Sequence, residues 1–388
     1  MPPNLVVALI AGFLSLFAGD QLEFEDQFGT HMKLTPQTIL NVFFIFIPLC
    51  IIGKVLGYND AFIFSTACLG IIPLAGVMGK ATEYLSDRVG HGIGGLLNAT
   101  FGNACELIIA FAALRAGLID VVKASITGSI IGNILLVLGG SMLAGGLRYQ
   151  TQTFNRTAAT TSATLLALAA ISLTVPAVYH FSAQHVPPLR EQRLALAISV
   201  IQITVYFLSL VFSLRTHKEL YAPDVDAEGE EAIGVTGWGV KKSIAILAGA
   251  TVMVAILSEL LVHAVEKAAH TMGLTQLFIG IVLVAIVGNA AEHSTAVLMA
   301  MKNKMDLAIN ISLGSGSQIA LFVAPVIVFT SFLIGRPMDL CFSIFEILAV
   351  VVSVIILSFV ATDGECNWLE GVQLLAVYGI LAAAFYFV

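Results

Sequence analysis

Two pentapeptides, Gly102-Asn103-Ala104-Cys105-Glu106 and Gly288-Asn289-Ala290-Ala291-Glu292, place a glutamate inside two hydrophobic segments and differ only at their fourth position. A shift of 186 residues superposes them and also superposes three further pairs of identical residues: Asp120 and Asp306, Gly128 and Gly314, Ser129 and Ser315. The chain therefore contains an internal repeat. Because an ionisable residue inside an apolar segment is costly, its occurrence at the same place in both copies indicates a functional site.

The amino-acid composition indicates whether the chain is surrounded by water or by lipid. Of its 388 residues, 58% are hydrophobic and only 11% are charged, and the net charge is -7. These values are typical of a polytopic membrane protein surrounded by a lipid bilayer. The acidic balance argues against nucleic-acid partners and favours cations. The five cysteines form no CxxC pair, so we expect neither a disulfide framework nor a zinc site.

Apolar runs of about 20 residues predict an all-α membrane protein with eleven transmembrane helices. We place them at roughly 36–57, 60–86, 92–117, 119–147, 156–181, 190–216, 241–270, 275–303, 305–335, 339–362 and 367–388. The pentapeptide recurs five helices later, and an odd number of spans inverts the second copy in the membrane. Inverted repeats are an architecture of secondary transporters, which bind substrate at the midplane.

Five segments follow from this pattern. Residues 32–57 form the extra first helix, 58–218 the first five-helix repeat, 219–240 an acidic linker and 241–388 the second repeat. The distribution of Lys and Arg among the loops favours a cytoplasmic location for the linker. Its clustered acidic residues indicate either a solvated loop or a calcium sensor. Residues 1–31 are an N-terminal extension: a signal-like or interfacial helix, or a fusion segment ending at the vector-like junction His31-Met32.

The chemistry concentrates around the two glutamates. Asn103 and Asn289 each lie three residues before their glutamate, so amide and carboxylate share a helix face. Gly102 and Gly288 allow close backbone approach or a helix break. The following helices add further polar side chains, namely Ser129, Asn133, Ser315 and Gln318. Oxygen ligands of these kinds suit a hard cation such as Ca²⁺, although Asn133 and Gln318 could instead hydrogen-bond helix to helix.

Three other titratable residues are candidates for supporting roles. Glu83 and Glu259 occupy corresponding helices of the two halves, and four carboxylates together could bind a cation, hold protons, or do both in turn. Each could also be a local surface partner near a helix end. His293 follows Glu292 and is either a proton relay or a polar neighbour that points about 100° away.

Three segments resemble the two alpha repeats of the calcium/proton exchanger (CAX) family of the calcium/cation antiporter superfamily. They are Gly94-Gly95-Leu96-Leu97-Asn98-Ala99-Thr100-Phe101-Gly102-Asn103-Ala104-Cys105-Glu106, Gly288–His293 and Lys302–Asp306. The similarity covers about Met32 to Val388. It implies eleven helices in total, in two inverted five-helix halves behind one additional first helix, and export of Ca²⁺ against H⁺ entry by alternating access. Glu106 and Glu292 match the central cation- and proton-binding glutamates, beside Asn103 and Asn289, while Glu83 and Glu259 match accessory acids.

Two residues depart from the family pattern. The family commonly has a serine where Gly132 precedes Asn133, which removes a hydroxyl ligand. Cys105 occupies a variable position beside Glu106, where oxidation or soft-metal binding is conceivable.

We therefore expect a Ca²⁺/H⁺ antiporter without a cofactor, whose glutamates bind Ca²⁺ and protons competitively. The alternatives are a Na⁺/Ca²⁺ exchanger of the same superfamily and a cation channel; an enzyme is disfavoured because HExxH and GxSxG motifs are absent. We expect an integral membrane protein of the plasma (inner) membrane, or alternatively of the vacuolar membrane. Homo-oligomerisation is compatible with the sequence.

Overall fold

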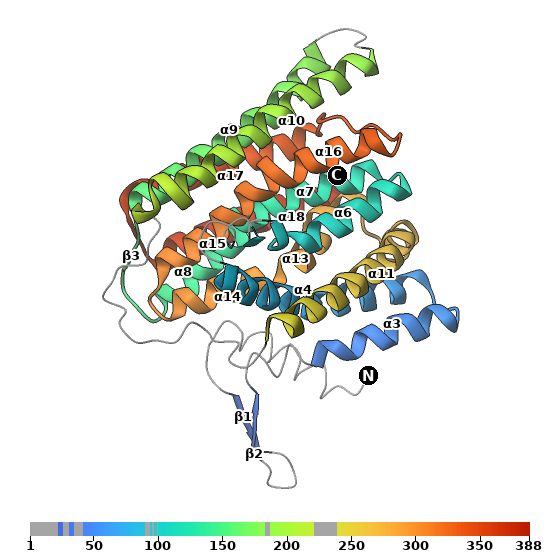
Figure 1. Cartoon of the computed structure of the whole chain (residues 1–388), viewed down its shortest axis with the longest axis horizontal. Coiled ribbons are helices and arrows are strands. Elements are labelled where there is room, and N and C mark those ends of the chain that lie inside the picture. Colours follow the sequence, from blue (N-terminus) through green and yellow to red (C-terminus); the bar gives the residue numbers. More distant parts are fainter. Residues whose placement is uncertain are drawn as a thin grey trace.

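The computed structural model describes residues 22–25, 31–34, 42–89, 94, 97, 98, 100–182, 187–220 and 239–388. The predictions for residues 1–21 and for most of the acidic linker lie outside this part of the chain. Within it, the protein is built almost entirely of helices (Figure 1), which confirms the helical membrane-protein class predicted from composition.

Two short strand pairs are exceptions to the all-α expectation. In the N-terminal extension, β1 (Leu22–Glu25) pairs antiparallel with β2 (His31–Leu34). Between the helices, β3 (Gln152–Thr153) pairs antiparallel with β4 (Glu365–Cys366). The second pair joins the loops before the helices α9 (Arg156–Ser182) and α18 (Trp368–Phe387), because backbone groups outside helices still need hydrogen-bond partners.

Eight helical stretches are long and apolar enough to cross a membrane, judged by length and composition over the described residues. They are Asp60–Val89, Ile119–Gly146, Arg156–Ser182, Pro188–Thr216, Val240–Met272, Met305–Leu333, Ile344–Asp363 and Trp368–Phe387. The pair Gln276–Gly288 and Ala290–Met301 passes the same test as one span, bent by 62°. The helix predicted at roughly 36–57 has a shorter described part, Phe43–Val55.

Several stretches are composite. The first elements of the described helical part are η1 (Phe43–Ile45), α3 (Phe46–Val55), α4 (Asp60–Val89) and α6 (Ala104–Ala116). The next span joins α7 (Ile119–Ile131), the π-helical η2 (Gly132–Val137) and α8 (Leu138–Gly146). They are followed by α9 (Arg156–Ser182), α10 (Pro188–Val211), the π-helical η3 (Phe212–Thr216) and η4 (Lys218–Leu220).

The second half has matching composite spans. It begins with α11 (Val240–Met272), α12 (Gln276–Phe278), the π-helical η5 (Ile279–Val284), α13 (Ala285–Gly288) and α14 (Ala290–Met301). It continues with α15 (Met305–Gln318), the π-helical η6 (Ile319–Val323), α16 (Ala324–Leu333), α17 (Ile344–Asp363) and α18 (Trp368–Phe387).

One predicted helix starts later than expected. The apolar pattern suggested a start near residue 339, but α17 begins at Ile344, where Ser343 and Glu346 form a capping box. The preceding residues satisfy their backbone groups with side chains: Met338 N–H donates to Ser331 Oγ at 2.8 Å and Cys341 N–H donates to Asp339 Oδ1 at 2.9 Å. An apolar composition alone does not reveal these bonds.

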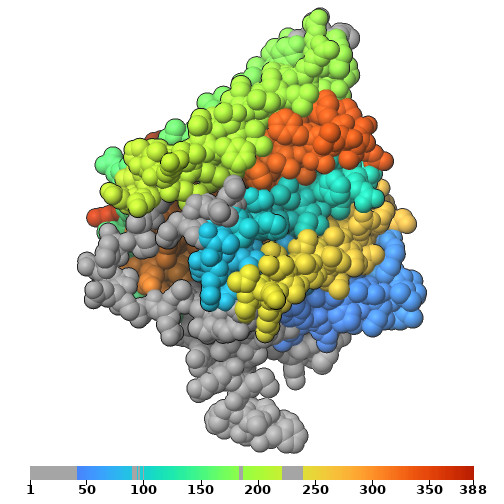
Figure 2. All heavy atoms as spheres, viewed as in Figure 1, coloured from blue at the N-terminus to red at the C-terminus, as the bar shows by residue number. Residues whose placement is uncertain are grey.

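The composite span α7–η2–α8 lies at the centre of the bundle, with 94% of its most apolar window buried. By contrast, only 22% of the most apolar window is buried in the spans that contain α10 and α18. In Figures 1 and 2, one face shows α9 and α10, α16, α6, α11 and α3 in successive bands, and α11 packs along α4. Peripheral helices carry the large apolar side chains that are exposed in the protein alone, as a lipid-facing surface requires.

Small residues let α7 approach η5 with backbone against backbone. A Cβ atom added to Gly128 would lie 2.1 Å from the carbonyl oxygen of Ile281, and one added to Gly280 would lie 2.5 Å from Cβ of Ala124. Close helix crossings of this kind depend on residues without bulky side chains. The contact joins a helix of the first half to the segment leading to Asn289.

Candidate functional site

The two asparagines of the pentapeptides mark equivalent helix interruptions. Asn103 precedes α6 with φ −98° and ψ 24°, and Asn289 separates α13 from α14 with φ −96° and ψ 7°. The second interruption coincides with the 62° bend. The first break includes Gly102, as expected, whereas Gly288 ends α13 and the second break falls one residue later, at Asn289. Both breaks put Glu106 and Glu292 in the first turn of the helices that follow.

Each glycine faces the glutamate of the other half. A Cβ on Gly288 would lie 3.3 Å from Cγ and 3.5 Å from Oε1 of Glu106, and a Cβ on Gly102 would lie 3.8 Å from Oε1 of Glu292. The absence of side chains at both glycines therefore makes room for the two carboxylates. This reciprocal contact brings the repeats together around one central site.

The asparagines also bond across the halves. Asn103 Nδ2 donates to Oε1 of Gln318 on α15. Asn289 Nδ2 donates to Oγ of Ser129 on α7 at 3.0 Å and to the carbonyl oxygen of Ala285 at 2.9 Å. The broken helix of each half is thereby joined to a helix of the opposite half: Asn103 to α15, and Asn289 to α7. Both asparagines are buried.

Ser315 and Asn133 close this network. The Ser315 hydroxyl accepts from Asn133 Nδ2 at 3.0 Å, and its oxygen lies 3.3 Å from Asn103 Oδ1 and 3.4 Å from Asn289 Oδ1. Because a hydroxyl has one hydrogen, it can donate to only one of these two oxygens at a time. Asn133 and Gln318, considered above as ligands or helix connectors, both make hydrogen bonds between helices here, and cation ligation by them stays a prediction.

Several oxygens at the centre have no hydrogen-bond partner among the described residues. They are Oε2 of Glu106, Oε2 of Glu292 and Oδ1 of Asn133, and all three are shielded from solvent. A buried polar atom without a partner is unfavourable unless an ion, a proton or water satisfies it. A pair of carboxylates beside amide and hydroxyl oxygens is suited to binding a hard divalent cation.

His293 lies on α14 directly after Glu292. It is partly buried, and its Nε2 is shielded from solvent without a hydrogen-bond partner among the described residues. No bond from its ring to either glutamate is present in this part of the chain, so its role as a relay stays a prediction.

The structure does not bring Glu83 and Glu259 to the central pair, Glu106 and Glu292. Both residues are exposed, Glu83 on α4 and Glu259 on α11. Glu259 Oε1 lies 3.3 Å from Nη1 of Arg115, and both side chains are about half exposed. An exposed ion pair of this kind contributes roughly 0 to 1 kcal/mol. A common four-carboxylate site is therefore absent from this arrangement of the described helices.

Sequence reasoning missed two further symmetric features. The π-helical η2 (Gly132–Val137) and η6 (Ile319–Val323) coincide under the 186-residue shift, and so do Gly117 and Asn303, which have positive φ of 85° and 58°. π-Helical turns often occur at functional sites. Because glycine and asparagine favour the left-handed conformation, Gly117 and Asn303 could have been predicted from the sequence as helix ends. The π-turns have no comparable sequence signal.

Comparisons with known proteins agree with this architecture. A model described as sodium/calcium exchanger protein matches residues 59–215 and 242–387. The Ca(2+)/H(+) antiporter of Aphanothece halophytica is 46% identical over 364 residues, covering 91% of this chain and 98% of the relative. The Ca(2+)/H(+) antiporter ChaA of Bacillus subtilis is 45% identical over 350 residues, covering 89% and 99%.

A solved structure has the same arrangement of helices. Native YfkE matches with a TM-score of 0.77 and 42% identity, covering 89% of this chain and 100% of that chain. Together with the matched family model, this similarity confirms the resemblance drawn from the pentapeptides. The chain belongs to the sodium/calcium exchanger protein family.

Proposed function

We propose that the protein is a secondary antiporter that exchanges Ca²⁺ for H⁺ across a membrane by alternating access. The observation that carries this proposal is the reciprocal placement of Glu106 against Gly288 and of Glu292 against Gly102. The name Ca(2+)/H(+) antiporter of the two relatives described above supports the same ion pair. Ca²⁺ is the transported substrate, and we propose no cofactor.

The exchange follows from the electrostatics of the paired glutamates. Two ionised carboxylates shielded from solvent are unfavourable unless opposite charge compensates them. One Ca²⁺ or two protons supply that charge, and both use the same oxygens. The site therefore releases Ca²⁺ when protons bind, and it releases protons when Ca²⁺ binds.

The same argument explains the coupling. A site with two uncompensated charges would carry a large cost through the membrane interior, whereas a loaded or protonated site is neutral. Only compensated states then change access between the two sides. In this mechanism Asn103, Asn289, Ser129 and Ser315 join the two halves around the ion, so that binding is sensed by both.

We also propose that the described helices form two inverted repeats within the eleven-helix arrangement. The matching breaks at Asn103 and Asn289, the matching π-turns, and the matching left-handed residues Gly117 and Asn303 support this symmetry. On this basis residues 58–218 and 241–388 are the two repeats, joined by a cytoplasmic linker in a plasma-membrane protein; the vacuolar membrane is the alternative location.

Inversion makes a topological prediction. Ala116 and Lys302 are related by the 186-residue shift, and both are exposed next to the left-handed residues. If the repeats are inverted, cysteines introduced by Ala116→Cys and Lys302→Cys should react with a membrane-impermeant thiol reagent from opposite sides of oriented vesicles. A Cys341→Ser background reduces labelling of the native thiol that is least buried. Labelling of both from the same side contradicts inversion.

Transport by the reconstituted protein tests the function itself. In liposomes, Ca²⁺ accumulation should follow an imposed pH gradient and should be unaffected by an imposed Na⁺ gradient, because the site is neutralised by protons. Flux that follows Na⁺ without dependence on pH identifies a Na⁺/Ca²⁺ exchanger. Flux with neither gradient and with single-channel currents identifies a channel, and both outcomes contradict the proposal.

A further inference from the structure

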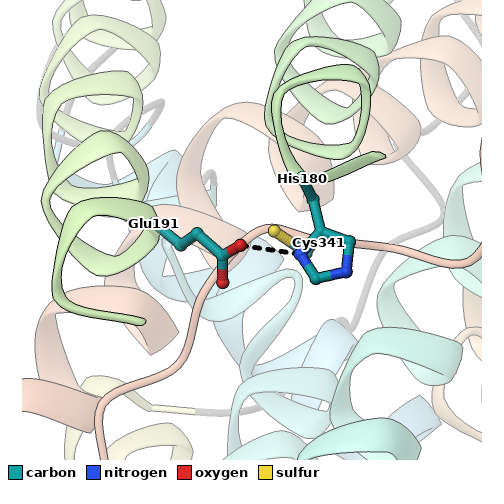
Figure 3. A group of neighbouring side chains, drawn as sticks. All are labelled: His180, Glu191 and Cys341. Carbon is teal, nitrogen blue, oxygen red and sulfur yellow. Dashed lines mark hydrogen bonds and ion pairs between the residues drawn. The ribbon is translucent and has the colours of Figure 1, made fainter. Parts of the chain in front are cut away.

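A second group of possible metal ligands lies away from the central glutamates. His180, Glu191 and Cys341 come from three segments, and their Nδ1 or Nε2, carboxylate oxygen and Sγ atoms lie within 4.8 Å of one another (Figure 3). His180 is in the last turn of α9, Glu191 is in the first turn of α10, and Cys341 is in the loop before α17. Figure 3 shows the three side chains converging between these segments.

Hydrogen bonds of its backbone hold Cys341 in place independently of any ion. The Cys341 carbonyl accepts from Lys123 Nζ at 2.9 Å, and its N–H donates to Asp339 at 2.9 Å. Lys123 Nζ also donates to Asp339 Oδ1 at 2.5 Å. Cys341 is therefore held against α7 through Lys123, and its thiol is not needed to hold the loop.

The histidine and the glutamate are already in contact. His180 Nδ1 lies 2.6 Å from Glu191 Oε1, and the two side chains are 49% and 10% exposed. The site is thus open to solvent on the histidine side and closed on the glutamate side. An ion could enter past the imidazole and find the carboxylate and the sulfur beneath it.

The donor set distinguishes this group from the central site. We propose that His180, Glu191 and Cys341 form a binding site for a thiophilic divalent metal ion such as Zn²⁺. Imidazole nitrogen, carboxylate oxygen and thiolate sulfur are the ligands of zinc, whereas Ca²⁺ takes oxygen ligands only. Three protein ligands leave a fourth position for water on the exposed side.

The geometry requires only small movements. Metal–ligand distances of about 2.0 Å for nitrogen and oxygen and 2.3 Å for sulfur place tetrahedral ligand atoms roughly 3.3 to 3.6 Å apart. The histidine–glutamate contact would lengthen from 2.6 Å, and the sulfur would move inward from its contact with the Pro176 carbonyl oxygen at 3.8 Å. These shifts are within the reach of side-chain rotation.

The metal must displace a proton from sulfur. Burial raises the pKa of the Cys341 thiol to about 12, with further increases from the charges of Asp339 and Glu191 that outweigh the effect of Lys123. Without metal, the sulfur is a neutral thiol at pH 7, and coordination converts it to the thiolate. Zinc binding should therefore release a proton, and the affinity should rise with pH.

Such a site would connect segments that belong to different parts of the bundle. His180 and Glu191 lie at the ends of α9 and α10 where these helices meet, and Cys341 is tied to α7 through Lys123. A bound ion would link the α9–α10 hairpin to the loop before α17. The cluster lies at the N-terminal end of α10, whereas His217 and the linker lie beyond its C-terminal end.

The test uses Zn²⁺ and Co²⁺ on the full-length protein purified in detergent. Co²⁺ bound to a thiolate gives a charge-transfer absorption band, which a carboxylate site does not. We expect this band in the unmodified protein and its displacement by Zn²⁺ but not by Ca²⁺. The Cys341→Ser variant should lose the band, and His180→Gln should weaken binding at least about tenfold.

Two matched variants are the controls. Cys366→Ser removes a buried cysteine in β4, and Cys105→Ser removes the cysteine beside Glu106. Both should retain the band. Loss of the band in Cys105→Ser with retention in Cys341→Ser would place the metal at the central carboxylates and overturn the proposal, as would absence of the band from the unmodified protein.

A second measurement needs no variant and therefore does not depend on the folding of one. Zn²⁺ should slow alkylation of Cys341 in the native protein, because a coordinated sulfur is not free to attack the reagent. Equal alkylation rates with and without Zn²⁺ at saturating concentration contradict the site.

Discussion

Replacement of Glu106 or Glu292 by glutamine should abolish proton-driven Ca²⁺ transport while the protein remains folded. Glutamine has nearly the same shape as glutamate, but it neither holds a negative charge nor takes up a proton in exchange for Ca²⁺. Loss of one charged partner from a desolvated site costs about 2 to 5 kcal/mol, which corresponds to a roughly 30-fold to several thousand-fold loss of affinity. The measurement is Ca²⁺ flux into liposomes under a pH gradient.

The folded state should tolerate these substitutions because Oε2 of each glutamate makes no hydrogen bond among the described residues. Elution as a single species and an apparent Tm close to that of the unmodified protein would show this. Glu266→Gln is the matched control, since Glu266 is an exposed glutamate on α11. It should retain full transport; retained proton-coupled flux in both Glu106→Gln and Glu292→Gln would refute the assignment of the site.

Gly128→Ala should have the largest effect on stability. The added Cβ would lie 2.1 Å from the carbonyl oxygen of Ile281, so α7 and η5 must separate by about 1 Å to restore van der Waals contact. Overpacking typically costs about 1 to 3 kcal/mol, and here the obstacle is backbone that cannot rotate away. For a chain of 388 residues, we expect the apparent Tm to fall by roughly 1 to 4 °C.

Transport should fall in the same variant because the displaced helices carry the site. Ser129 follows Gly128 and accepts a hydrogen bond from Asn289, which lies beyond η5 and α13. Gly379→Ala is the control: it is an exposed glycine in α18, and no described atom lies within 4 Å of its added Cβ. That variant should be as stable as the unmodified protein; equal stability of Gly128→Ala would show that the α7–η5 contact is looser than described.

The membrane class and the central pair could be predicted from sequence for a simple physical reason. A glutamate inside an apolar run is unfavourable in a lipid environment, and a glycine–asparagine step before it interrupts a helix. Both signals occur twice at a fixed offset, so Glu106 and Glu292 could be identified without coordinates. The structure then placed each of them against the glycine of the other half.

The positions of Glu83 and Glu259 could not be obtained in this way. Both lie in apolar helices at corresponding places, yet both are exposed, and Glu259 pairs with Arg115. Helix rotation and neighbouring helices decide whether an acid points inward, and neither is encoded in hydropathy alone. The same limit applies to Asn133 and Gln318, whose hydrogen bonds cross between halves of the chain.

The sequence by itself determined that this is a helical membrane protein with two related halves and a pair of glutamates inside apolar helices, because bilayer thickness and the cost of buried charge act on local stretches of chain. Only the tertiary structure decided which residues meet. His180, Glu191 and Cys341 form a cluster although the expectation from cysteine spacing was that no zinc site exists. Ligands separated by up to 161 positions converge through helix packing, which spacing along the chain does not report.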